Sequence, residues 1–181
     1  MQLQPGDRVE ALRQRSILDQ PVQIPGADGR LTHLQLRRHA GCPICNLHLR
    51  SFAARLGELQ AAGIQEVAVF HSDAETMRPF QGELPFAVIA DPNKELYRQL
   101  GVESALRSVL DPRAWPGLMR GLLSGASRDP MSGEGGHLGL PGDFLIASDG
   151  TLLACKYGRH ADDQWSVDEL LALARRTPPE A

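Results

Sequence analysis

The chain is poor in cysteine and in net charge, and each shortage excludes a class of protein. Three cysteines among 181 residues are too few for a secreted disulfide scaffold. The formal net charge of -3 lacks the basic excess of a broad nucleic-acid surface. No run approaches the roughly 18 apolar residues of a membrane helix, and residues 1–7 contain no secretory leader pattern. We therefore expect a cytoplasmic protein that binds neither nucleic acid nor membrane.

The remaining composition is that of an ordinary globular protein. It is 42% hydrophobic and 23% charged. A chain of 181 residues holds one well-buried core more comfortably than two. We predict a single domain over residues 1–181, with an insertion at residues 103–140 that is rich in glycine, serine and proline.

The first third of the chain predicts a strand that delivers a loop into a long helix. Arg8 to Leu18 is a short helical candidate, and Pro21 to Ile24 is expected to form a hairpin whose second arm starts near Leu31. Thr32 to Arg38 alternates between polar and apolar residues, as strands do. From Pro43 to Ala62 the apolar residues recur at helical spacing, so the loop between strand and helix carries the first two cysteines.

The middle of the chain alternates strands with helices. Glu66 to His71 and Phe86 to Ala90 are apolar runs typical of buried strands. A capping box from Ser72 to Glu75 predicts one helix, and Lys94 to Leu100 predicts another. This order favours a central parallel sheet with right-handed crossovers.

The rhythm stops at the predicted insertion and resumes after it. The insertion contains an apolar group of residues from Trp115 to Leu123, which fits either a packed extra helix or a lid or dimer contact. Asp143 to Ala147 and Leu152 to Tyr157 predict an antiparallel hairpin, and Ser166 to Arg176 predicts a final helix.

Cys42 and Cys45 are the candidate redox residues, because two cysteines separated by two residues at the start of a helix have sulfurs close enough to bond. With Pro43 as the first helical residue, Cys42 is the N-cap. Unpaired N–H groups and the helix dipole then stabilise a thiolate. The neighbouring cationic or imidazole side chains could add to that effect: Arg37, Arg38, His39 and His48.

Other interpretations of these cysteines stay open. Both could be small core residues. His39, Cys42, Cys45 and His48 recur every third residue and could bind a metal, although four ligands across a strand-to-helix junction would be hard to close into a tetrahedron. We expect no metal and no cofactor. Cys155 is expected to pack on a strand, and Asp143 and Arg159 to lie at strand ends, facing either the site or solvent.

Two motifs resemble a known family. Arg37 to Cys45 resembles the Arg-Arg-x-x-Gly-Cys-x-x-Cys segment of peroxiredoxin-like redoxins in the alkyl hydroperoxide reductase and thiol-specific antioxidant (AhpC/TSA) group. Leu140 to Ile146 is similar to the cis-proline strand of thioredoxin-fold proteins, and Tyr157 to Asp162 to the strand end that follows. The resemblance implies an α/β fold of thioredoxin-like type, with three layers and a central mixed sheet.

The resemblance also implies an active site. Cys42 and Cys45 would be catalytic, with Gly41, Pro43 and Pro141 contacting substrate and with Arg38, His39 and Arg159 in support. We expect the Leu140-Pro141 bond to be cis and to lie against the cysteine pair, where only proline makes a cis bond affordable.

The family's usual peroxidatic motif, Pro-x-x-x-Thr-x-x-Cys, is absent. With Cys45 in the cysteine position, Arg38 and Cys42 replace the proline and the threonine. With Cys42 there, the replacements are Gln35 and His39. The sequence therefore predicts a thiol-disulfide oxidoreductase more firmly than a peroxidase. Its substrate would be a protein disulfide or a peroxide, its reductant would be of thioredoxin or glutathione type, and the chain could form a homodimer. The alternative functions are a metal-binding module that uses Cys42 and Cys45 with nearby histidines, and an inactive fold used in protein association.

Overall fold

The computed structural model describes residues 2–102, 115–124 and 140–176, and its centre is a mixed sheet. The strand order is β5-β4-β3-β6-β7. β3 pairs in parallel with β4, and β4 with β5, whereas β6 runs antiparallel to both β3 and β7. The strands are β3 (Leu31–Arg37), β4 (Ile64–Phe70), β5 (Ala87–Ala90), β6 (Gly142–Ile146) and β7 (Leu152–Tyr157). The predicted parallel core and the C-terminal hairpin are both confirmed.

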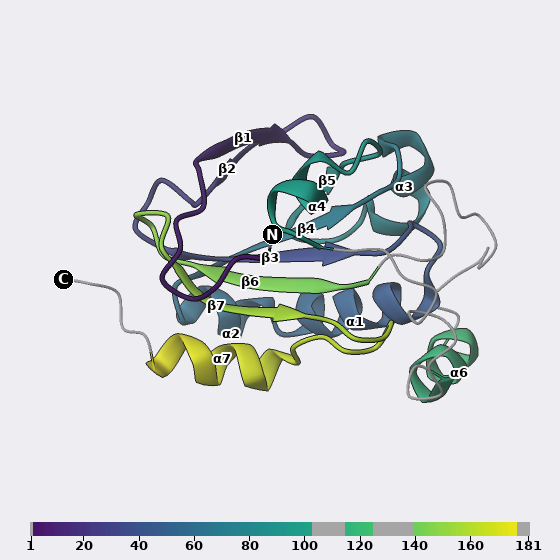
Figure 1. Cartoon of the computed structure of the whole chain (residues 1–181). Helices are drawn as coiled ribbons and strands as arrows, with labels where there is room; N and C mark the ends of the chain where they lie inside the picture. The colour runs from purple at the N-terminus through teal and green to yellow at the C-terminus, as the bar shows by residue number, and fades with distance from the viewer. Residues whose placement is uncertain (1, 103–114, 125–139, 177–181) are drawn as a thin grey trace.

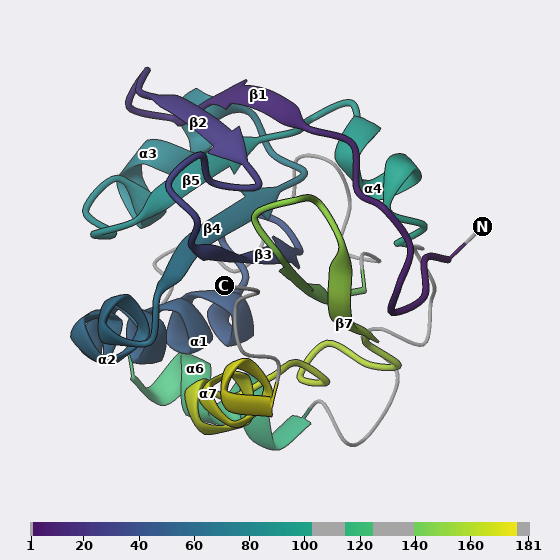
Figure 2. The same ribbon diagram turned by 90° about the vertical axis from the view of Figure 1, so that its left-hand side faces the viewer.

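Helices cover both faces of this sheet (Figure 1). α4 and the N-terminal hairpin lie on one side, and α1, α2 and α7 lie on the other, which gives three layers when the molecule is turned (Figure 2). The helices are α1 (Pro43–Ala54), α2 (Leu56–Ala61), α3 (Ala74–Gln81), α4 (Glu95–Gln99), α6 (Trp115–Leu123) and α7 (Val167–Arg176). No helix in the described ranges is both long and apolar enough to span a bilayer.

The two faces of β3 carry different chemistry, because successive side chains of a strand point to opposite sides. Leu34 and Leu36 are fully buried in the apolar cluster beneath α4. His33, Gln35 and Arg37 alternate with them and are also fully buried, on the side of α1 and α7. Because this central strand is covered on both faces, it buries three polar side chains at alternate positions on one face.

The N-terminal segment differs from the prediction. β1 (Leu12–Arg15) occupies part of the expected helix and pairs antiparallel with β2 (Pro21–Ile24). The helix prediction was wrong because Leu12 to Arg15 pair with β2, and from this strand Leu12 packs against the cluster below α4. A strand does start at Leu31, as predicted, but the hairpin pairing was wrong because β3 pairs with β4 and β6.

Two helix boundaries also differ. The long helix predicted from Pro43 to Ala62 is interrupted at Arg55, which caps the end of α1 and the start of α2. α3 is capped by Asp73, whose carboxylate accepts the Thr76 N–H at 2.9 Å, and not by Ser72. Pro79 lies inside α3, so it does not end that helix.

The predicted insertion is described only in part. Of its residues, the structure describes 115–124 and Leu140, and α6 confirms a helix there beside α1. Five large apolar side chains of α6 are exposed: Trp115, Leu118, Met119, Leu122 and Leu123. The single domain over 1–181 and the boundaries 103–140 stay predictions.

Candidate redox site

The first turn of α1 holds both cysteines of the pair. Cys42 is the N-cap, with extended backbone angles, and its sulfur accepts the Cys45 N–H at 3.4 Å. Pro43 follows in the first helical turn, where its missing N–H costs no hydrogen bond. β3 ends at Arg37, so five residues of loop lead from the centre of the sheet to this N-terminus. The predicted strand-loop-helix placement of the pair is confirmed.

The two sulfurs are in direct contact. Both cysteines are free thiols, and the Cys45 thiol donates to the Cys42 sulfur at a Sγ–Sγ distance of 2.8 Å. Neither side chain is exposed. A disulfide would need only a short approach to its bond length of about 2.05 Å. A partner, by contrast, reaches either sulfur only when the surrounding segment moves.

The contacts of the two thiols shift their pKa values in opposite directions. Burial alone would raise the pKa of Cys42, but the Cys45 thiol, the Arg38 guanidinium and the N–H groups of the first turn together lower it to about 6. Burial and the adjacent Cys42 sulfur hold the pKa of Cys45 well above its ordinary value. At neutral pH Cys42 is therefore largely thiolate and Cys45 remains a thiol.

Of the four neighbours expected to support the thiolate, Arg38 does so directly. Its Nη1 donates to the Cys42 sulfur at 3.6 Å, and the side chain is buried. His39 contributes its backbone carbonyl, which accepts the Cys42 N–H at 3.1 Å. Arg37 and His48 point into the layer between β3 and α1, where Arg37 Nη2 contacts His48 Nε2 at 3.0 Å.

The loop between β3 and α1 is fastened to three other segments. The Ala40 N–H donates to Ser72 Oγ at 3.1 Å. Its carbonyl accepts from Asn46 Nδ2 and from Gln81 Nε2, both at 2.9 Å. Asn46 is the residue after Cys45, so one side chain of α1 closes back on the loop that precedes Cys42. The backbone around the redox pair is therefore held by a dense set of buried hydrogen bonds.

A buried group of charged and polar side chains lies beneath α1. Asp143 Oδ1 accepts from Arg37 Nη2 at 2.5 Å and lies 3.3 Å from His33 Nε2. His33 Nδ1 contacts Glu66 Oε2 at 2.9 Å. Gln35 joins the two halves, since its Oε1 accepts from Arg37 and its Nε2 donates to Glu66. All five residues belong to three adjacent strands, β4, β3 and β6.

The charges in this group balance. Burial opposes protonation of His33, but the carboxylates of Glu66 and Asp143 raise its pKa to about 9. Burial likewise opposes ionisation of Asp143, and Arg37 and His33 hold its pKa well below the ordinary value. His33 and Arg37 thus carry two positive charges against the carboxylates of Glu66 and Asp143.

This buried group was not predicted from the sequence, although the sequence contains a signal for it. Asp143 was expected to face the site or solvent, and it is fully buried. His33, Gln35 and Arg37 are three polar residues in phase on a strand that the parallel topology makes central and buried on both faces. Buried charges must be paired, so Glu66 and Asp143 on the adjacent strands were the partners to look for.

The cis-proline prediction was wrong. The Leu140-Pro141 bond is trans, and Ile24-Pro25 is the cis bond found within the described residues. Pro141 nevertheless precedes β6 at the end of the sheet from which the cysteine loop leaves, because Gly142 pairs with Leu36. The Pro141 carbonyl accepts the Gly158 N–H at 2.9 Å, so this proline fixes the junction of β6 with the end of β7. Contacts of Pro141, Gly41 and Pro43 with substrate stay predictions.

Two further predicted residues lie apart from the sulfurs. Arg159 Nε is 3.3 Å from Asp163 Oδ2, and the side chain is largely exposed. Arg159 and Pro141 together line a cavity of about 230 Å³ that no cysteine borders. Cys155 is half-buried on β7, and burial raises the pKa of its thiol. This placement fits the packing role expected for Cys155.

A family comparison covers most of the chain. The model of the AhpC/TSA antioxidant enzyme family matches residues 51–160. The chain belongs to the AhpC/TSA family. The match begins after Cys42 and Cys45, so the AhpC/TSA assignment rests on the part of the fold that follows α1's first turns and does not itself assign roles to the cysteines. A comparison with curated proteins gives no significant match.

Solved structures show the same architecture. Peroxidoxin BcpB from Mycobacterium tuberculosis matches with a TM-score of 0.69 and 15% identity, over 96% of this chain and 97% of that one. A structure described as the thiol:disulfide interchange protein DsbE from Chlorobium tepidum has a TM-score of 0.62, 20% identity and coverage of 95% and 99%. The reduced 2-Cys peroxiredoxin of Plasmodium vivax matches with a TM-score of 0.67 and 10% identity, over 94% of this chain and 80% of that one. These likenesses confirm the thioredoxin-like fold of this AhpC/TSA member.

No group of three or more His, Cys, Asp and Glu side chains in residues 2–102, 115–124 and 140–176 could hold an ion. His48, one of the four spaced ligands considered, is turned toward Arg37.

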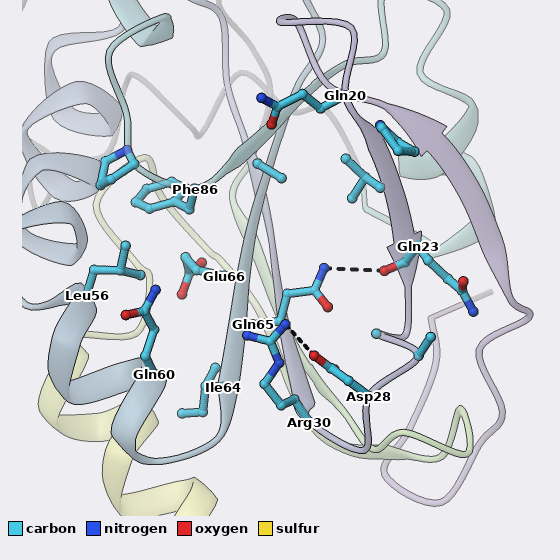
Figure 3. Close-up of a pocket in the computed structure, with 16 residues that line it drawn as sticks. Gln20, Gln23, Asp28, Arg30, Leu56, Gln60, Ile64, Gln65, Glu66 and Phe86 are labelled. Carbon is cyan, nitrogen blue, oxygen red and sulfur yellow. Dashed lines mark hydrogen bonds and ion pairs between the residues drawn. The ribbon is translucent and has the colours of Figure 1, made fainter.

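A cavity of about 360 Å³ lies at the other end of the sheet, between the β1–β2 hairpin and α2 (Figure 3). Gln20, Gln65 and Glu66 are among its lining residues, and no cysteine is.

Proposed function

We propose that this AhpC/TSA protein is a thiol-disulfide oxidoreductase that cycles between the Cys42/Cys45 dithiol and a Cys42–Cys45 disulfide. The observation that carries the proposal is the contact between a sulfur whose pKa is lowered to about 6 and a second thiol 2.8 Å away. One group is prepared to attack at neutral pH, and the other is placed to resolve the product.

The reaction follows from this division of roles. The Cys42 thiolate attacks one sulfur of an oxidised partner, forms a mixed disulfide and releases the partner's other sulfur as a thiolate. Cys42 then carries no charge, so the repulsion that raises the pKa of Cys45 ends while Arg38 still favours a thiolate there. Cys45 attacks Cys42, forms the intramolecular disulfide and releases the partner as a dithiol.

Peroxide reduction is the second function that the findings favour. It is supported by membership of an antioxidant enzyme family and by Arg38, whose guanidinium could bind a peroxide oxygen beside the Cys42 sulfur. Here the thiolate would attack one peroxide oxygen, become a sulfenic acid and release water or an alcohol. Cys45 would then condense with the sulfenic acid and release a second water.

A side-by-side assay separates these functions. Reduced protein is given equal amounts of a disulfide substrate or of hydrogen peroxide, with thioredoxin and its reductase or glutathione as the regenerating system. We expect disulfide reduction that Cys42→Ser abolishes. Peroxide consumption at the faster rate would make the peroxidase the main activity. If neither substrate is turned over faster than by a Cys42→Ser, Cys45→Ser double variant, the proposal fails.

The proposed setting is the cytosol, where a thioredoxin- or glutathione-type reductant keeps the pair reduced. Compartment-specific tagging of the full chain tests this setting independently of activity. An exclusively extracytoplasmic location would contradict it.

A further inference from the structure

Three contacts are nested around the redox pair. The innermost joins the sulfurs of Cys42 and Cys45. Outside it, Asn46 Nδ2 donates to the Ala40 carbonyl at 2.9 Å. Outside that, Arg37 Nη2 contacts His48 Nε2 at 3.0 Å. Each tie links a residue before the Pro43-Ile44 step to one after it, so the chain from position 37 to position 48 forms a ring closed at three levels.

We propose that the two outer ties form a clasp that sets the dithiol-disulfide equilibrium, with Arg37, Asn46 and His48 as positioning residues. This inference rests on the proposed function and says how the same site is tuned. The ties hold the first turns of α1 against β3, so the dithiol is kept in a geometry close to that of the disulfide. Oxidation then costs little additional chain entropy.

The outer tie is anchored by the buried charged group. Arg37 Nη2 also donates to Asp143 at 2.5 Å, and Arg37 Nε donates to Gln35 at 2.8 Å. Asp143 in turn receives the Trp165 N–H at 3.2 Å and contacts protonated His33. The far end of the group is Glu66, at the wall of the cavity in Figure 3. Arg37 is therefore held from several sides and acts as a fixed point for α1.

His48 is a suitable acceptor for this fixed point. Burial and the adjacent Arg37 keep the pKa of His48 well below its ordinary value, so the ring is neutral and Nε2 can accept the guanidinium hydrogen. The ring also packs on Phe52, with centroids 4.7 Å apart. Because Arg37 keeps Asp143 and Gln35 as acceptors, removing His48 loosens α1 without leaving the arginine unpaired.

Stability alone is a poor explanation for this arrangement. Four charged groups out of water carry a large desolvation cost, and apolar replacements of buried ion pairs are often neutral or stabilising. These charged groups instead fix the position of α1 relative to β3. A positioning role predicts a change in redox equilibrium that is separable from any change in stability.

The test compares His48→Leu with His48→Gln in the full chain. Leucine fills similar space against Phe52 but accepts no hydrogen bond, whereas the glutamine amide oxygen can still accept from Arg37. Each protein is equilibrated with mixtures of reduced and oxidised glutathione. In this exchange, two cysteine thiols and one glutathione disulfide give the Cys42–Cys45 bond and two glutathione thiols. The oxidised fraction is read by alkylation and mass spectrometry.

We expect His48→Leu to lower the equilibrium constant for disulfide formation about tenfold, the scale of one buried charge-assisted hydrogen bond. His48→Gln should stay within about twofold of the native value. Leu170→Ala, which empties a fully buried site on α7, should lower the melting temperature without moving the equilibrium. Asn46→Ala removes the hydrogen bond from Asn46 to the Ala40 carbonyl and should shift the equilibrium in the same direction. It replaces His48→Leu if that variant does not fold.

Two results would overturn the clasp. One is an equilibrium constant for His48→Leu, or for Asn46→Ala in its place, that equals the native value within about twofold. The other is a shift in Leu170→Ala as large as that in His48→Leu, which would reduce the effect to general destabilisation. Failure of the native chain to form a Cys42–Cys45 bond at any glutathione ratio would instead refute the proposed function.

Discussion

The reactivity of Cys42 depends on one guanidinium more than on any other side-chain charge. Arg38 Nη1 lies 3.6 Å from the Cys42 sulfur, and both groups are buried, so water screens their attraction weakly. Arg37, the adjacent arginine, is bound to Asp143 and does not share this role. A buried cation at this distance lowers a thiol pKa by roughly one to three units.

Arg38→Met should therefore raise the pKa of Cys42 by at least about one unit. The measurement is the rate of iodoacetamide modification against pH, in a Cys45→Ser, Cys155→Ser background that reports on Cys42 alone. Arg38→Lys keeps a charge at the same position and should restore most of the native profile. An unchanged profile in Arg38→Met would show that the helix N-terminus suffices without the guanidinium.

The different pKa values of the two cysteines predict which one meets the partner. A Cys45→Ser variant should accumulate a mixed disulfide through Cys42, because attack proceeds and resolution does not. Cys42→Ser should accumulate none, since the pKa of the remaining Cys45 thiol is raised by burial. Non-reducing electrophoresis with a disulfide-bearing partner reads both outcomes. Trapping through Cys45 would reverse the roles.

At the scale of elements, β3 does the most to build the site. It supplies Leu34 and Leu36 to one core, the polar side chains to the layer beneath α1, and the loop that carries Cys42. Its pairing with β4 and β6 brings Glu66 and Asp143 to either side of His33. The strand therefore links the charged group and the redox pair through a few residues of backbone.

The charged group should make stability depend on pH in a known direction. The pKa of His33 is about 9 when folded, against an ordinary value of 6.5. A raised pKa favours the protonated folded state, so the stabilisation is complete below about pH 6.5 and is lost as the pH rises through about 9. The full effect is at most about 3 kcal/mol, from the cost of each pKa unit.

Urea unfolding of His33→Gln and its parent at several pH values measures this contribution. Both proteins carry Cys42→Ser and Cys45→Ser, because ionisation of Cys42 would change stability in the opposite direction over the same range. The difference in unfolding free energy should shrink between about pH 6.5 and 9. A difference independent of pH would mean that His33 is neutral in the folded protein.

Elements with strong periodicity were predictable from sequence, and elements defined by tertiary pairing were not. The buried runs of β4 and β5 and the amphipathic α7 follow from local pattern. Arg8 to Leu18 was expected to be helical, whereas its strand forms because β2 pairs with it. The break at Arg55 and the α3 cap at Asp73 are helix boundaries, which are harder to predict from sequence than the helices themselves.

At the scale of the whole molecule, the placement of the cysteine pair could be predicted from sequence but its environment could not. Spacing and Pro43 were enough to place Cys42 at a helix N-terminus. That Arg38 faces the Cys42 sulfur while Arg37 faces Asp143 depends on where β3 ends, because Arg37 is its last residue and Arg38 is the first residue of the loop. The trans state of Leu140-Pro141 shows that a familiar motif order does not settle a backbone isomer.

The complete protein, purified under reducing conditions, should contain no stoichiometric metal. The two thiols are engaged with each other and with Arg38, and an added cation would meet a buried guanidinium at the Cys42 sulfur. Elemental analysis of zinc and iron per chain is the measurement. About one ion per chain, lost in both Cys42→Ser and Cys45→Ser, would move the site to the metal-binding class.

Peptide mapping shows whether Cys42 and Cys45 form a reversible disulfide with each other while Cys155 takes no part. The full chain is oxidised with glutathione disulfide, alkylated, digested without reductant and analysed by mass spectrometry, then reduced and analysed again. We expect one dominant linkage, Cys42 to Cys45, that disappears on reduction. Cys155 should be alkylated throughout because it lies on β7 with its sulfur 3.5 Å from the Leu3 carbonyl. A main product joining Cys155 to either Cys42 or Cys45 would contradict it.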